Sequence, residues 1–398
     1  MSTRMLAALV TVSLGTSVLA ATPLKLANNY SGKDFFNGFR FNITDANHPD
    51  PNGGNIHSTA MAGPSPLAFV NNAGNIILRV DNTTNDLNPG PYSIFGRNTV
   101  QVISNDPINI NTLLVASVAH IPFGCSVWPA FWTLDAATQS DVGGEIDIIE
   151  PVNLMTQNQY SLHTRTGCTA SESSSFPHTG TKGATDCDAN SIGGNTGCII
   201  QEPAQNSVGP NFAGGVYAMY WSTNGIQMWL FPTSSIPSDL QSNSPDPSTW
   251  PTPSASYPAS TCDPNTFFSP QEIIFDIDIC GPTYAGLASV FHETCPNVSE
   301  CQTLVANGAN YDNAYWEINY VKTFIGGPSP LANSSSTATT GSAAPTGSAS
   351  SNSSTGGTSS SNSNSSNSSG AIALETGVLS ILCTVVGVVL AGAVSRVL

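Results

Sequence analysis

Charged side chains are scarce in this sequence, and basic ones are the scarcest. Lys and Arg together number 10 among 398 residues, against 26 Asp and Glu, so the formal net charge is −16. So few cations cannot neutralise a phosphate backbone, which argues against nucleic acid as a partner. A sparsely charged, acidic surface with many Ser, Thr and Asn instead favours a neutral polar ligand.

The sequence also lacks any stretch that keeps helical periodicity over three turns. From about residue 22 to 325, short runs rich in Val, Ile, Thr and aromatic residues alternate with Gly, Pro, Asn and Ser. These runs predict strands over residues 75–80, 99–103, 115–118, 160–164, 216–221, 226–231, 272–279 and 315–324. So many short strands predict an all-β fold, a β-jelly-roll sandwich of two packed antiparallel sheets.

The start of the chain carries a processing signal. Residues 1–20 combine Arg4, an apolar run and small residues near Ala20, which is typical of a secretory signal peptide. A membrane anchor is the weaker alternative, because the apolar run is short and contains Gly15 and Ser17. Residues 21–326 are then the expected folded domain.

The end of the chain differs sharply in composition. Residues 327–370 are almost entirely Ser, Asn, Thr, Gly, Ala and Pro without charge, which predicts a disordered, O-glycosylated stalk. Residues 371–398 hold an apolar run and follow small residues near Asn367, the pattern of a removable GPI-anchor signal. A transmembrane helix is the alternative, but it would normally be followed by a basic flank, and here only residues 395–398, with the single basic residue Arg396, follow the apolar run. We therefore expect a secreted monomer held at the cell surface by a glycolipid.

Cysteine usage agrees with export. Of nine cysteines, Cys383 lies in the tail, and the remaining even number in an exported chain predicts disulfides. No pair has the CxxC spacing of a zinc site, so we expect no metal and no cofactor. Many connectivities remain open; a local loop closed by Cys295 and Cys301 is one guess. N-glycosylation sequons at Asn29, Asn42, Asn82 and Asn297 fit the secretory route.

Three carboxylates interrupt one apolar run, Glu145-Ile-Asp-Ile-Ile-Glu150. On a regular strand side chains alternate between faces, so Glu145 and Asp147 share a face. Strict alternation would turn Glu150 into the core, where an unpaired carboxylate costs several kcal/mol. A β-bulge at Ile148-Ile149 returns Glu150 to the face of the other two acids.

Glycoside cleavage needs such a group of acids. One acid protonates the leaving oxygen and a second attacks the anomeric carbon, and a retaining route requires their carboxyls within ~5–5.5 Å. Strand rise alone would separate the Cα atoms of Glu145 and Glu150 by more than ~13 Å, so the motif predicts a concave catalytic cleft. Asp147 between them can hydrogen-bond the nucleophile and help keep the acid protonated. A solvated strand face or a calcium site is the alternative, and the surrounding isoleucines argue against the first.

Aromatic residues precede this motif. Trp128 and Trp132 share strand parity, and their flat rings suit stacking on sugars; core packing is the alternative. His163 lies on the next predicted strand and could hydrogen-bond Glu150, unless its role is structural.

Two further pairs are less informative. Asp276 and Asp278 share a strand face and could line the cleft, although turn or backbone hydrogen bonding is favoured. Trp221 and Trp229 fall in a predicted hairpin around Asn224-Gly225; Trp229 is expected in the core, and Trp221 is left open.

The motifs together resemble glycoside hydrolase family 16, in particular fungal endo-1,3(4)-β-glucanases of the laminarinase type. The resemblance rests on Trp128–Trp132, Gly144–Glu150, Leu162–Thr164 and Tyr315–Tyr320. It implies a β-jelly roll and retention of configuration. It also implies that Glu145 is the nucleophile, Asp147 its helper and Glu150 the general acid/base. The bulged spacing is similar to laminarinases, whereas lichenases and chitin–glucan transglycosylases have Glu-x-Asp-x-Glu.

Two segments depart from this family's pattern. Residues 139–144 replace a Trp-Pro before the motif, and residues 280–286 replace Cys-Gly-Asp-Trp-Ala-Gly, so two stacking aromatics are missing or changed. Three functions therefore stay open: an endo-glucanase acting on β-1,3 or mixed β-1,3/1,4-glucan, a cell-wall glucan transglycosylase with the same site, and a non-catalytic glucan-binding wall protein. Retention of the three acids argues against the last.

Overall fold

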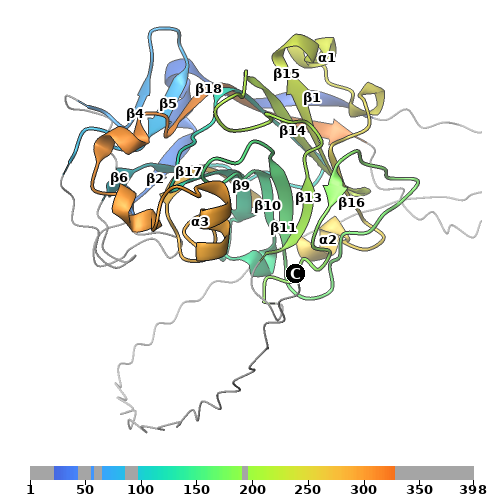
Figure 1. Ribbon diagram of the computed structural model, residues 1–398. Helices are drawn as coiled ribbons and strands as arrows, with labels where there is room; N and C mark the ends of the chain where they lie inside the picture. The colour runs from blue at the N-terminus through green and yellow to red at the C-terminus, as the bar shows by residue number, and fades with distance from the viewer. Residues whose placement is uncertain (1–21, 44–54, 58–64, 86–96, 191–195, 328–398) are drawn as a thin grey trace, which may run out of the picture. The chain divides into compact units, whose positions relative to one another are not determined.

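The fold consists of two eight-stranded sheets, in a computed structural model that describes residues 22–43, 55–57, 65–85, 97–190 and 196–327. Figure 1 shows the arrangement of their strands. Neighbouring strands within both sheets are antiparallel. The all-β sandwich that the sequence predicts is confirmed. The predicted signal peptide, stalk and anchor tail lie outside the described residues.

We name the sheets after a central strand of each. The β14 sheet has the order β16 (Ala255–Pro258), β15 (Gly225–Pro232), β14 (Gly215–Ser222), β8 (Thr112–His120), β18 (Tyr315–Gly327), β5 (Ile76–Arg79) and β4 (Ala68–Val70), with β1 (Thr22–Ser31) also paired to β18. The β10 sheet has the order β12 (Thr181–Lys182), β13 (Cys198–Gln201), β11 (Gln159–His163), β10 (Glu145–Ile149), β9 (Val127–Asp135), β17 (Gln271–Ile279), β7 (Gln101–Ser104) and β2 (Phe39–Asn42).

Helices are short throughout the described residues. The longest α-helix is α3 (Ala288–Thr294), and α1 (Ser238–Gln241) and α2 (Pro264–Phe267) are single turns. The 3₁₀ turns are η1 (Gly32–Asn37), η3 (Asp141–Gly143), η4 (Thr233–Ser235), η5 (Pro247–Thr249), η6 (Cys301–Leu304) and η7 (Gly308–Tyr311). A small parallel pair joins β3 (Asn55–His57) to β6 (Arg97–Thr99). The expected lack of long helices is therefore confirmed for this part of the chain.

Each predicted run coincides with or overlaps a strand, because hydrophobic alternation is a local signal. The strands β1, β2, β3, β4, β12, β13 and β16 were not predicted. These strands are mostly short or carry many polar residues, so period-two patterning is weak in them.

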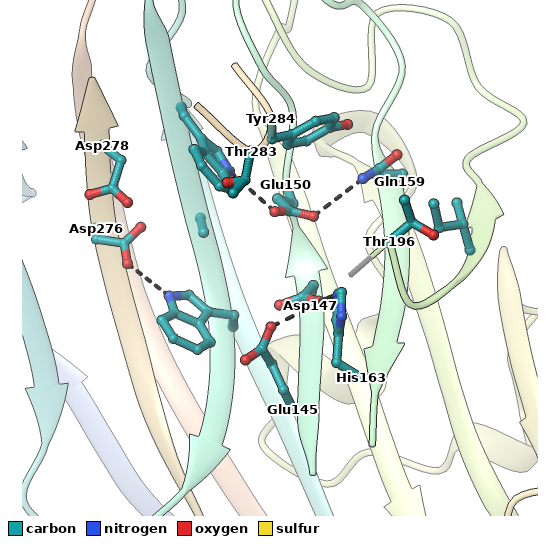
Figure 2. Close-up of a pocket in the computed structure, with 14 residues that line it drawn as sticks. Glu145, Asp147, Glu150, Gln159, His163, Thr196, Asp276, Asp278, Thr283 and Tyr284 are labelled. Atoms are coloured by element: carbon teal, nitrogen blue, oxygen red, sulfur yellow. Dashed lines mark hydrogen bonds and ion pairs between the residues drawn. The ribbon is translucent and has the colours of Figure 1, made fainter. Parts of the chain in front are cut away.

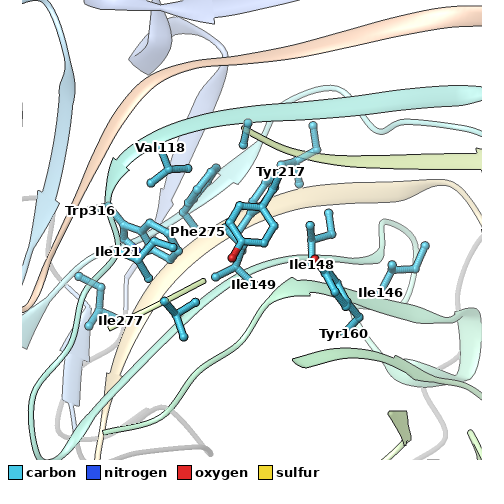
Figure 3. Close-up of a cluster of buried hydrophobic side chains, with 14 of the residues drawn as sticks. Val118, Ile121, Ile146, Ile148, Ile149, Tyr160, Tyr217, Phe275, Ile277 and Trp316 are labelled. Atoms are coloured by element: carbon cyan, nitrogen blue, oxygen red, sulfur yellow. The ribbon is translucent and has the colours of Figure 1, made fainter. Parts of the chain in front are cut away.

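The main core lies between the two sheets (Figure 3). Ile146 and Ile148 of β10 and Phe275 of β17 enter it from one sheet, and Tyr217 of β14 and Trp316 of β18 enter it from the other. All five are fully buried. Burial at roughly 25 cal/mol per Å² of apolar surface makes this layer the main source of stability and thereby fixes which face of β10 is left for chemistry.

The eight cysteines of the folded part form disulfides between Cys125 and Cys295, Cys168 and Cys262, Cys187 and Cys198, and Cys280 and Cys301. The prediction of disulfides is confirmed, and the guess of a Cys295–Cys301 loop is wrong. Cys295 instead ties the segment after β17 to Cys125, just before β9. Cys301 ties the same segment to Cys280, at the end of β17. Among the described residues, no helix has the length and apolar character needed to cross a bilayer.

Candidate active site

The three acids of the motif line one pocket of about 250 Å³ on the side of the β10 sheet away from the core. Figure 2 shows Glu145, Asp147 and Glu150 along β10, facing the same space. The isoleucines between them, in contrast, are fully buried in the core. The separation of faces that the sequence predicts is therefore present.

A bulge produces this arrangement. Asp147 of β10 pairs with Trp132 of β9, but Ile149 pairs with the next residue, Phe131, which leaves Ile148 as the additional residue. Ile148 and Ile149 are both buried, and the following residue, Glu150, returns to the pocket. The predicted bulge is confirmed at the predicted place.

Asn158 holds the backbone at the bulge. Its side-chain Nδ2 donates to the carbonyl oxygen of Ile148 (2.8 Å), and its Oδ1 accepts from the backbone N–H of Glu150 (3.0 Å). A bulge removes backbone groups from the ladder between strands, and buried groups without partners are costly. Asn158 was not predicted, because it lies on the segment before β11 and is brought to the bulge only by the fold.

Glycine is required immediately before the first acid. Gly144 has φ +89°, and a Cβ built there would lie 2.3 Å from the ring of Phe268 and 2.7 Å from the carbonyl oxygen of Phe267. Both the backbone conformation and the close approach therefore exclude other residues. The chain can turn from η3 into β10 beneath these phenylalanines.

Glu150 accepts hydrogen bonds from two side chains. Trp128 Nε1 donates to Oε1 (3.1 Å) and Gln159 Nε2 donates to Oε2 (3.2 Å). Tyr284 lies edge-on to Trp128, with ring centroids 5.5 Å apart, and lines the same pocket. The carboxyl group of Glu150 is thereby oriented by residues from β9 and β11.

His163 contacts Asp147 and Glu145, whereas the sequence suggested Glu150 as its partner. Its Nε2 lies 3.3 Å from Asp147 Oδ2 and 3.9 Å from Glu145 Oε1. Ser161 Oγ also donates to Asp147 Oδ2 (2.8 Å). The reason is register: Glu145 pairs with His163 and Asp147 with Ser161 across β10 and β11, whereas Glu150 lies beyond the last of these pairs.

The electrostatics of the pocket favour retained protons. Burial, followed by the charge of Asp147, raises the pKa of Glu145 to about 8 and that of Glu150 to about 7. Burial alone would lower the pKa of His163, but its hydrogen bond to Asp147 and the nearby carboxylates raise it to about 10. Near neutral pH the site therefore combines an imidazolium with a glutamate pair that keeps a proton which ordinary carboxyl groups would have lost.

Glu145, Asp147 and His163 also have ligand-type atoms within 4.8 Å of one another. The hydrogen bond of His163 to Asp147 raises the pKa of the imidazole and uses Nε2 as a donor. The sulfur cluster of Cys168, Cys187 and Cys198 is committed to disulfides.

Trp128 and Trp132 both line the pocket, as their shared parity predicts, and each is partly exposed. Asp276 and Asp278 line it too, which is the role that the sequence favoured less. Trp132 Nε1 and Gln101 Nε2 both donate to Asp276 Oδ2, at 2.9 and 3.0 Å. Trp221 and Trp229, by contrast, are buried away from this pocket.

Gly197 lies directly against His163. A Cβ at this position would lie 2.9 Å from Nε2 of His163 and 2.5 Å from the carbonyl oxygen of Leu162, and φ is +59°. The neighbouring Cys198 is bound to Cys187, which fixes the chain here. The sequence around Gly197 does not indicate this contact, because His163 and Leu162 are more than thirty residues away in the chain and only the fold brings them together.

A family model described as the XgeA-like catalytic domain of glycoside hydrolase family 16 matches residues 43–324. The chain is 36% identical over 249 residues to an endo-1,3(4)-β-glucanase of Arthroderma benhamiae, covering 61% of this chain and 53% of the relative. The chain thus spans about half the length of this curated relative.

Solved structures are similar over most of the chain. GH16 laminarinase 16A from Phanerochaete chrysosporium, with β-glucans in its donor and acceptor sites, is 34% identical with a TM-score of 0.68, covering 76% of this chain and 100% of that one. An elongating GH family 16 β-1,3-glucosyltransferase is 36% identical with a TM-score of 0.66, covering 76% and 99%. With three acids on one bulged strand and a family match over most of its folded part, this chain belongs to glycoside hydrolase family 16.

Proposed function

We propose that this chain is an endo-β-glucanase that hydrolyses β-1,3 or mixed β-1,3/1,4-glucan with retention of configuration. The observation that carries the proposal is the set of Glu145, Asp147 and Glu150 on one pocket wall, with pKa values of the two glutamates raised to about 8 and about 7. The named relatives act on, or bind, the same class of polymer.

In the first step, Glu150 gives its proton to the glycosidic oxygen while the carboxylate of Glu145 forms a bond to the anomeric carbon. The bond to the leaving sugar breaks, and a glycosyl ester on Glu145 results. The two glutamates together keep a proton near neutral pH, because the pKa of Glu150 is raised to about 7 and that of Glu145 to about 8. The position of Glu150 in the family motif supports its assignment as the acid of the pair. The Trp128 and Gln159 donors hold its carboxyl group in place.

In the second step, Glu150 takes a proton from water, whose oxygen attacks the anomeric carbon and releases Glu145 as a carboxylate. Asp147 and the His163 cation lie beside Glu145 throughout. The cation offsets the negative charge that the site gains when both glutamates are ionised. Two inversions at the same carbon give net retention.

The test is digestion of laminarin and lichenan by the secreted protein, with Glu145→Gln, Glu150→Gln and, as a matched control, the exposed Glu300→Gln. We expect shortened products from wild type and the control, β-anomers as first products by NMR, and a loss of several orders of magnitude in both site variants. Unchanged polymer after incubation with wild type would contradict the proposal and favour a non-catalytic glucan-binding protein.

Transfer to a sugar in place of water is the second candidate, and one observation favours it. The solved β-1,3-glucosyltransferase of the same family is as similar to this chain as the laminarinase is. An added oligosaccharide acceptor separates the two activities. Products longer than the acceptor would identify a transglycosylase that remodels wall polymer, and only shortened products would identify a hydrolase.

We also propose that the protein is secreted and held at the cell surface or wall by a GPI anchor. The signal-like start, the sequons and the paired cysteines of the described part support export. Treatment of cells with a phosphatidylinositol-specific phospholipase should release the protein. Retention on treated cells would instead favour a transmembrane tail.

A further inference from the structure

The β14 sheet has a second face, turned away from the catalytic sheet. Tyr217 and Trp221 of β14 point into the main core, so Tyr220 points to the opposite side. On that side a separate cluster of buried residues includes Leu24, Trp229 and Leu240, and Tyr220 and Trp250 pack against it. Figure 1 shows β1, β14, β15 and α1, the elements that carry Leu24, Tyr220, Trp229 and Leu240.

A groove of about 1000 Å³ lies on this face. One wall is the segment 243–253, one end is formed by residues 23–26 of β1, and the floor includes outward side chains of β14 and β15. Its lining is dominated by rings and amides: Tyr220, Trp229, Trp250, five prolines outside β1, Asn224, Gln227 and Asn243. None of these residues belongs to the catalytic pocket.

The wall is fixed by its own contacts. Trp250 Nε1 donates to Asp239 Oδ2 (2.8 Å), and its ring lies edge-on to Trp229 and to Phe231, with both centroid distances 5.2 Å. Lys322 Nζ donates to Asn243 Oδ1 (2.8 Å), which ties the far part of the segment to β18. A groove that is formed before binding loses little conformational entropy when a ligand enters.

The chemistry of the groove suits a neutral, hydroxyl-rich ligand. Tyr220 and Gln227 are neighbours across β14 and β15, and neither side chain has a hydrogen bond to another of the described residues. Lys25 and Asp246 are the charged lining residues, and Asp246 accepts from Ser248 of its own turn. Flat rings next to unused amide and hydroxyl groups match the two kinds of surface on a sugar, its C–H face and its hydroxyl edge.

The dimensions suit a chain rather than a single sugar. From β1 the sheet crosses β18, β8 and β14 before it reaches β15. With strands roughly 4.8 Å apart, these elements span about 19 Å. We propose that this groove is a non-catalytic binding site for a second segment of β-glucan, on the face opposite the catalytic pocket. The choice of glucan as the ligand rests on the proposed function.

The test uses the secreted protein and two readouts. Binding to insoluble β-1,3-glucan is measured by sedimentation in a Glu145→Gln background, and cleavage of a laminari-hexasaccharide is measured with Glu145 intact. Tyr220→Ala and Gln227→Ala are compared with Tyr315→Ala, a partly exposed tyrosine of the same sheet outside the groove. We expect both groove variants to bind the polymer at least fivefold more weakly, with unchanged cleavage of the short substrate.

Unchanged polymer binding in Gln227→Ala, or an equal loss in Tyr315→Ala, would overturn the proposal. If Tyr220→Ala unfolds by circular dichroism, Gln227→Ala and Gln227→Glu decide the question, because this side chain lies at the surface of the sheet. A wild-type protein that binds polymer through the groove but cleaves no hexasaccharide would contradict the proposed function alone. A protein that neither binds nor cleaves would contradict both.

Discussion

The imidazole of His163 lies beside Asp147 and Glu145, and its pKa of about 10 keeps it a cation while the glutamates titrate. Its charge lowers the pKa of Glu145 and of Glu150, against the larger opposing effect of burial. The proton affinity of the two glutamates is therefore reduced, against the effect of burial, by a residue that need not touch the sugar.

Replacement of His163 by Gln should move the pH–activity profile upward. Without the cation the pKa values of both glutamates rise, so the acid keeps its proton to higher pH and the nucleophile ionises only at higher pH. The measurement is kcat/KM on laminarin between pH 4 and 9, with the exposed His292→Gln as control. A profile that only falls in height, without a shift, would show that His163 acts by packing alone.

Glu150→Gln should be more stable than wild type at pH 8. The pKa of Glu150 is about 7 in the folded protein and near 4.5 in the unfolded chain, so between these values the folded state binds more protons. Stability therefore falls as pH rises through this window, and glutamine removes the effect. Thermal unfolding should show a midpoint a few degrees higher at pH 8 and little difference at pH 4. Equal unfolding midpoints of the two proteins at pH 4 and at pH 8 would mean that burial does not raise the pKa of Glu150.

At the scale of elements, the bulge in β10 decides which residues face the pocket. A single additional residue, Ile148, turns Glu150 to the pocket, while Ile148 and Ile149 both stay buried in the core. The backbone groups that the bulge frees are taken up by Asn158.

Asn158→Ala should damage both stability and catalysis. It leaves the buried backbone groups of Ile148 and Glu150 without their partner, at a cost of about 1–3 kcal/mol for each group that finds no water. Because the backbone N–H of Glu150 loses its anchor, kcat should fall roughly tenfold or more while KM changes little. Urea unfolding and kinetics on laminarin measure the two effects, with the exposed Asn265→Ala as control. Full activity in a folded Asn158→Ala protein would show that the bulge keeps its conformation without the hydrogen bonds of Asn158.

At the scale of the whole molecule, the disulfides differ in reach. Cys125 and Cys295 are 170 residues apart in the sequence, whereas Cys187 and Cys198 are 11 apart. The longer closure restricts the unfolded chain more, by about 5 against about 3 kcal/mol in the chain-entropy model. The shorter one holds Gly197 against His163.

The disulfide whose removal costs more stability should therefore differ from the one whose removal costs more activity. Cys125→Ser with Cys295→Ser should lower the free energy of unfolding more than Cys187→Ser with Cys198→Ser. The second pair should lower kcat/KM more, because it releases the chain that packs on His163. Denaturant unfolding and laminarin kinetics of both double variants test this. The same order in both measurements would show that the Cys187–Cys198 bond serves stability alone.

Much of the site follows from local sequence. The faces of Glu145 and Asp147, the bulge before Glu150 and the parity of Trp128 and Trp132 depend on the geometry of one strand, so alternation alone predicts them. The same local signal predicts most of the longer strands and the sandwich class, because each strand must bury one face.

The tertiary structure decided what depends on residues far apart in the chain. The partner of His163 depends on the register of β10 against β11, and the cysteine pairing depends on which loops meet after both sheets have formed. Asp276 joins the pocket because β17 lies next to β9. Strand alternation determines which face a side chain takes, but only the packing of strands determines what it meets there.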